Sequence, residues 1–127
     1  MQNESAAAKF ERILNERTRD LLHDATLERM TIIGESASVV LEVEHMTDTE
    51  HEQTENIVLS ELTFTGVRHF VLENEVDCFP EENEISSFVG TASQRQSQFE
   101  LIGIRGWTIR FHANTFDYSE RIVGTYN

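Results

Sequence analysis

The chain has 127 residues and a formal net charge of −13, with 39% hydrophobic and 26% charged residues. This length and composition are typical of one globular domain, expected over residues 1–127, and not of a disordered chain. No apolar run reaches the roughly 18 residues of a membrane span, and no segment has the apolar core of a secretory signal, so we expect a cytoplasmic protein without a membrane partner.

The negative charge is concentrated in the middle of the chain. Residues 35–84 hold fourteen acidic residues and one basic residue, Arg68. Binding of nucleic acid phosphates needs clustered Lys and Arg, so a nucleic acid partner is not expected. A basic protein or a cation is the partner class that this charge favours, although acidity also serves solubility alone.

A helix is predicted for residues 5–22. Ser5 is a suitable N-cap, and the alanines at 6–8 have the highest helix propensity. The apolar residues of this segment lie broadly on one side of such a helix: Phe10, Ile13, Leu14, Leu21 and Leu22. We expect this side to pack against a sheet or against a second subunit, which would make a homo-oligomer.

Alternation of apolar and polar residues predicts strands through a β region over about 26–124. Phe64, Val67 and Phe70 are spaced by three, which a flat strand does not place on one face, so a bulge is expected near Gly66. One helix and seven to eight strands in consecutive hairpins predict an α+β, mainly β fold. The expected architecture is an antiparallel β-sandwich or open barrel.

The clearest strand pattern lies in residues 99–118. Trp107, Ile109 and Phe111 share one face of a predicted strand, and Gly103 and Gly106 suit the tight turn before it. We expect Trp107 to be core. An exposed Trp107 would instead make this hairpin the first candidate binding site.

Two acidic segments, 46–55 and 73–84, lack apolar periodicity and are predicted to be exposed loops. Together with the strand before the first of them, they supply the carboxylates that we expect to contact a basic partner. These candidate partner-binding residues are Glu42, Glu44, Asp48, Glu50, Glu52, Glu73, Glu75, Asp77, Glu81 and Glu82.

The sequence predicts no catalytic residue, metal site or cofactor. His23 and Asp24 precede a strand without the further ligands of a metal-dependent hydrolase, so a structural role at a turn is favoured. The segment around His51 lacks the central glycine of a calcium loop. His69 and His112 each lie in a predicted strand, where a surface or core-edge position is the simplest interpretation. The single cysteine, Cys78, cannot form an internal disulfide.

Three segments together resemble the small β-rich immunity-type proteins of bacterial polymorphic toxin systems. They are LHDATLERMTI at 22–32, LTFTGVRHFVLE at 62–73 and FELIGIRGWTIRFHANTF at 99–116. The resemblance covers about half of the chain and implies a mainly β domain without known catalysis. Some relatives are taken to neutralise a cognate toxin by binding it. The shared positions look like framework, so the resemblance transfers no functional residue.

The first functional hypothesis is therefore a non-enzymatic binding protein, with toxin immunity as its specific form. One alternative is a small β-barrel that binds a ligand or acts as a hydrolase within its mouth. That alternative needs a cavity lined by polar groups such as His69, His112, Arg110 or Tyr118. The other alternative is a structural protein that self-associates through its N-terminal helix.

Overall fold

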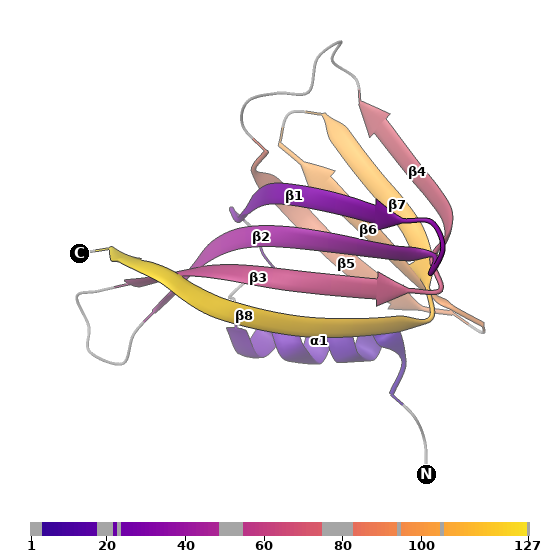
Figure 1. Ribbon diagram of the computed structural model, residues 1–127, viewed down its shortest axis with the longest axis horizontal. Helices are drawn as coiled ribbons and strands as arrows, with labels where there is room; N and C mark the ends of the chain where they lie inside the picture. Colours follow the sequence, from indigo (N-terminus) through magenta and orange to yellow (C-terminus); the bar gives the residue numbers. More distant parts are fainter. Residues whose placement is uncertain are drawn as a thin grey trace.

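The computed structural model describes residues 4–17, 22, 24–48, 55–74, 83–93, 95–104 and 106–126. Helix α1 (Ala6–Arg17) is followed by strands β1 (Thr26–Ile33), β2 (Ser38–Asp48), β3 (Glu55–Thr65), β4 (Arg68–Asn74), β5 (Ile85–Ala92), β6 (Ser97–Gly103), β7 (Trp107–Ala113) and β8 (Thr115–Tyr126). The strands form two antiparallel sheets, sheet A with the order β1-β2-β3-β8 and sheet B with the order β4-β7-β6-β5 (Figure 1). The fold is thus a mainly β sandwich with one N-terminal helix, which is one of the two predicted architectures. The strands do not close into a barrel.

Two neighbouring strand pairs cross from one sheet to the other at a single corner. The β3/β8 pair of sheet A continues as the β4/β7 pair of sheet B, through Gly66 on one side and Asn114 on the other. Gly66 has a φ of 65°, and a Cβ at this position would lie 2.4 Å from Nδ2 of Asn114. The side-chain amide of Gln96 donates to both the Gly66 carbonyl and Oδ1 of Asn114, at 3.0 Å each. One glutamine therefore ties the two crossings together.

A β-bulge follows this corner in β4. Arg68 pairs with His112 and Val71 pairs with Arg110, so two residues of β4 oppose Phe111 alone. One of them, Phe70, stacks on Phe111 with ring centroids 6.1 Å apart. The other, His69, has a φ of 56°. The bulge expected near Gly66 is present, and it returns Phe70 to the inner face.

The hairpin of β6 and β7 supplies much of the core. Trp107, Ile109 and Phe111 are at most 1% exposed, which confirms that Trp107 is core. A Cβ on Gly103 would lie 1.9 Å from Cε2 of Trp107. Gly103 is therefore required because the indole lies directly against its backbone.

Helix α1 lies alongside β8 and contacts β5, β6 and β8 (Figure 1). The hydroxyl of Ser5 accepts from the N–H of Ala8 at 3.1 Å, which confirms the expected N-cap. Phe10 and Leu14 are fully buried, so the apolar side packs on the chain's own sheets. Within the described residues, no helix is long and apolar enough to cross a bilayer.

Three predicted boundaries are wrong. The helix ends at Arg17, residues 18–21 lie outside the described part, and Leu22 has a non-helical φ of 71°. Residues 46–48 belong to β2, because pairing with β3 extends the strand beyond its apolar stretch. Glu73 and Asn74 belong to β4, where they pair with β7. In both strands, cross-strand hydrogen bonds hold residues whose own sequence resembles a loop.

We predict that Phe10→Ala lowers the free energy of unfolding by about 3–5 kcal/mol, because the cavity opens between four other phenylalanine rings. Urea denaturation monitored by Trp107 fluorescence measures this. The matched control is Glu11→Ala, an exposed position of the same helix, with an expected change within about 0.5 kcal/mol. A loss below about 1 kcal/mol for Phe10→Ala would show that the helix does not support the core.

Candidate functional site

The outer face of sheet A carries a group of carboxylates at its centre. Glu42 and Glu44 flank the buried Val43 on β2, so both point away from the core, as the alternation predicts. On β3, Glu61 is the direct cross-strand partner of Glu42. On the other side, Arg29 of β1 forms an ion pair with Glu42 at 3.5 Å. The strand register thus places two like charges side by side with one compensating arginine.

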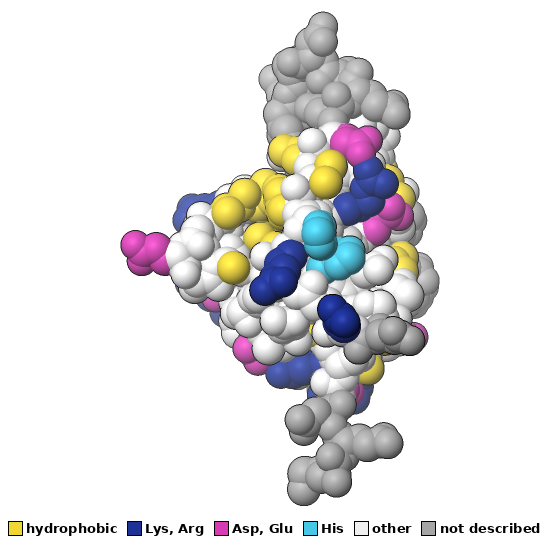
Figure 2. Space-filling model, turned by 90° about the vertical axis from the view of Figure 1, so that its right-hand side faces the viewer, with side chains coloured by type: hydrophobic (Ala, Val, Ile, Leu, Met, Phe, Trp, Pro, Cys, Tyr) yellow, Lys and Arg dark blue, Asp and Glu magenta, His cyan; other side chains and the backbone are white. Residues whose placement is uncertain are grey.

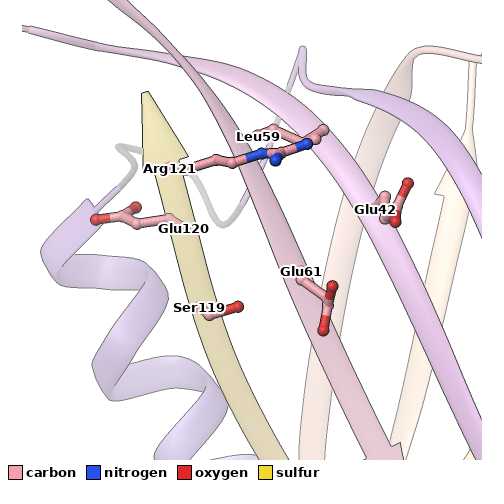
Figure 3. A pocket seen from close by; sticks show the side chains of 6 residues that line it. All are labelled: Glu42, Leu59, Glu61, Ser119, Glu120 and Arg121. Atoms are coloured by element: carbon pink, nitrogen blue, oxygen red, sulfur yellow. The ribbon is translucent and has the colours of Figure 1, made fainter. Parts of the chain in front are cut away.

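A shallow depression lies among these side chains. It has two overlapping parts that share Glu42, Leu59 and Arg121. We call this surface the acidic face, defined by Glu28, Arg29, Glu42, Glu44, Leu59, Glu61, Ser119 and Arg121. Figure 3 shows Arg121 reaching from β8 across β3 towards Leu59, while Glu120 projects from the other side of β8, towards α1. The acidic face offers an apolar patch at Leu59 surrounded by charges, four negative and two positive.

Three of the predicted partner-binding residues have described side chains, and they lie on two different sheets. Glu42 and Glu44 lie on the acidic face, on strand β2 of sheet A. Glu73 lies on β4 of the other sheet, where its carboxylate accepts from the guanidinium of Arg110. Asp48 ends β2, and its side chain is outside the described part. Outside the described residues lie Glu50, Glu52, Glu75, Asp77, Glu81 and Glu82.

Two acidic residues of this face, Glu28 and Glu61, are missing from the sequence-based candidates. The alternation of β3 between Ser60 and Leu62 already places Glu61 outward. What the sequence lacks is the register that puts Glu61 opposite Glu42. Glu28 lies in the β1 irregularity between Leu27 and Arg29, which no local pattern indicates.

A second group of polar residues forms a hydrogen-bonded chain that runs from the buried His45 and Ser60 on the inner side of sheet A to the exposed Glu120. The ring nitrogen Nε2 of His45 lies 2.6 Å from the hydroxyl of Ser60, which lies 2.6 Å from the hydroxyl of Tyr118. Tyr118 donates to the carboxylate of Glu120 at 2.8 Å. Because a carboxylate only accepts, the hydrogen bonds run in one direction, from Nε2–H of His45 to Ser60, to Tyr118 and to Glu120.

This direction places a proton on Nε2 of His45, so the charge of the ring depends on its other nitrogen. Its other nitrogen, Nδ1, is buried, and no hydrogen bond of normal geometry reaches it from the described residues. A proton on Nδ1 would be a buried donor without a good acceptor. Burial accordingly lowers the pKa of His45, an effect that the charge of Glu120 and the backbone of Met46 partly offset. Ser60 is completely buried, so its hydroxyl is not presented to a substrate in this conformation.

The remaining candidate residues lie elsewhere. Arg110 and His112 are on the face of β7 opposite the buried Ile109 and Phe111, and the interior that a ligand cavity would need is filled by apolar side chains. Asp24 has a φ of 67° and donates its backbone N–H to the Ile85 carbonyl at 2.9 Å. His23 and Cys78 are outside the described part. Within the described ranges, no three His, Cys, Asp or Glu side chains form a group that could hold a metal ion.

No protein-family model matches this chain, and no curated protein or solved structure is significantly similar to it.

We predict that His45 makes the protein less stable as the pH falls from about 7.5 to 5.5. The folded-state pKa is below the unfolded value of about 6.5, so the unfolded chain binds more protons in this window. The His45 contribution to stability is complete above the unfolded pKa, is lost as the pH falls through the folded pKa, and is constant below it. Denaturation at several pH values should give a smaller slope for His45→Gln than for the wild type. Equal slopes would contradict the prediction.

Proposed function

We propose that this chain is a non-enzymatic binding protein that contacts a basic protein partner through the acidic face of sheet A. The observation that supports this most is the direct pairing of Glu42 with Glu61. Like charges at directly opposed positions of an antiparallel pair are destabilising, whereas opposite charges at the same positions are stabilising. Arg29 compensates Glu42, but Glu61 forms no ion pair with a described residue, so a surface optimised for stability alone would not place a second glutamate opposite Glu42.

A basic side chain of a partner would remove this repulsion. A lysine or arginine placed between Glu42 and Glu61 gains two carboxylates at once, as charge-assisted hydrogen bonds favour. Leu59 supplies an apolar contact beside it, and Arg121 offers a donor to a carboxylate or carbonyl at the rim. This mixture of an apolar centre and a charged rim is typical of protein interfaces.

Charge outside the acidic face supports the same partner class. The whole chain has a net charge of −13, which would attract a basic partner over distances of about a Debye length. Glu50 and Glu52 belong to the segment that joins β2 to β3, the two strands that carry Glu42 and Glu61.

Toxin immunity is the specific form of binding that we propose. The resemblance of residues 22–32, 62–73 and 99–116 to immunity-type proteins supports it, since some of these proteins are taken to neutralise a cognate toxin by binding it. In this proposal, the acidic face covers a basic surface of the cognate toxin, such as a nuclease-like cleft.

The test begins with the full chain as bait in extracts of its native host, at low and at high salt, together with products of neighbouring genes. We expect a basic partner that is retained at low salt. For that partner, the triple variant Glu42→Gln/Glu44→Gln/Glu61→Gln should associate about tenfold more slowly at low ionic strength, because steering by charge is lost. Stopped-flow or surface plasmon resonance measures the rate.

A matched control separates the acidic face from net charge. The variant Glu11→Gln/Glu16→Gln/Glu35→Gln removes the same number of carboxylates from exposed positions elsewhere. Its association rate should change less than twofold. Equal slowing by both triple variants would contradict a defined site, and failure to recover any basic partner at either salt concentration would contradict the proposed function.

A further inference from the structure

We propose that the outer face of sheet B binds a divalent transition-metal ion between His69 of β4 and His112 of β7. This site lies on the other sheet from the acidic face and does not depend on the proposed function. The proposal also differs from the sequence-based expectation, which predicts no metal site at either histidine.

The separation of the two rings fits ligation of one ion. A metal–nitrogen bond of about 2.0–2.1 Å places the centre of each imidazole about 3.2 Å from the metal. At bond angles between octahedral and tetrahedral, two such rings have centroids about 4.5–5.2 Å apart. The centroids of His69 and His112 are 4.9 Å apart, with the ring planes at 63°.

The β4 bulge creates this pair. In a regular ladder continuing from the pairing of Arg68 with His112, residue 69 would oppose Phe111 and face the core. The extra residue instead gives the inner position to Phe70, and His69 contacts His112 on the outer face. His69 takes a positive φ of 56° to do so, a conformation that is unfavourable for a residue with a Cβ. Bulges that redirect a side chain, and strained backbone, are both concentrated at functional sites.

The exposure of the pair suits an ion with open coordination positions. His69 is exposed and His112 is half-buried, so water or a group from a partner protein can complete the shell. Imidazole nitrogen is a ligand for Zn²⁺, Ni²⁺ and Cu²⁺, whereas Ca²⁺ and Mg²⁺ prefer oxygen. We therefore assign the site to the transition-metal class.

Positive side chains near the histidines provide the sharpest test. Figure 2 shows a face of the molecule on which His side chains lie among Lys and Arg side chains. Glu73 forms an ion pair with Arg110, while Arg68 is the direct cross-strand partner of His112. The charge of Arg68 opposes a cation and would favour an anion. Removing it therefore changes the affinities for these two ligand classes in opposite directions.

The experiment uses the full chain without an affinity tag, stripped with EDTA and titrated calorimetrically with ZnCl₂. We expect one ion per chain, and a loss of affinity of at least about tenfold in His69→Gln and in His112→Gln. Arg68→Gln should bind Zn²⁺ roughly threefold more tightly, because a like charge is removed. The control His51→Gln removes another histidine of the chain and should bind as the wild type does.

Three results would overturn the proposal. The first is an absence of Zn²⁺ binding by the wild type. The second is Zn²⁺ affinity that is unchanged in both His69→Gln and His112→Gln, whatever the affinity of His51→Gln. The third is binding of inorganic phosphate that Arg68→Gln weakens, in the absence of Zn²⁺ binding, which would make the pair an anion site. Equal melting temperatures of all variants in EDTA would show that the fold is intact, so that each loss of affinity reports on ligation.

Discussion

The packing around Phe64 is the interaction on which the rest of the structure depends. Its ring contacts five other phenylalanines, which come from the helix and from both sheets: Phe10, Phe88, Phe99, Phe111 and Phe116. Phe64 lies on β3 just before the chain crosses from sheet A to sheet B. The chain must therefore turn sharply at Gly66, so that side chains from both sheets contact the ring of Phe64. Offset and edge-to-face aromatic contacts of this kind add to the burial of apolar area, and they fix how far apart the sheets lie.

The elements could be predicted from the sequence, whereas their division between two sheets could not. Alternation around Trp107 and Val43 identifies strands and their inner faces, because each side chain obeys a local period of two. The corner depends on Gln96, which lies 30 residues from Gly66 and 18 from Asn114. No local pattern indicates that contact, so sandwich and open barrel could not be distinguished. The predicted strand ends differ from the observed ones for the same reason, since pairing with a distant strand holds polar residues such as Glu73 in β4.

The candidate site shows the same limit in a sharper form. The outward direction of Glu42 and Glu44 follows from alternation, and it is correct. Their grouping with Glu73 rests on the acidic composition of residues 35–84, whereas the structure places β2 and β4 in different sheets. The pairing of Glu42 with Glu61 is a property of register, and so is the contact of His69 with His112. The sequence predicts on which face of a strand a residue lies, but it does not predict the residue's cross-strand neighbour. A site is formed by such neighbours.

Both proposed sites lie where the local interactions of the outer surface stabilise the fold less than a single substitution could. Glu42 and Glu61 are like charges at directly opposed positions with Arg29 paired to Glu42, and His69 holds a positive φ beside a second imidazole. The inner faces, by contrast, show consistent packing around Phe64, and the polar chain from His45 ends in an exposed carboxylate. A well-packed core can tolerate such costs of about 1 kcal/mol each at the surface. Because selection for stability alone would remove them by a single substitution, their presence on both outer faces is the physical reason to look for a ligand at each.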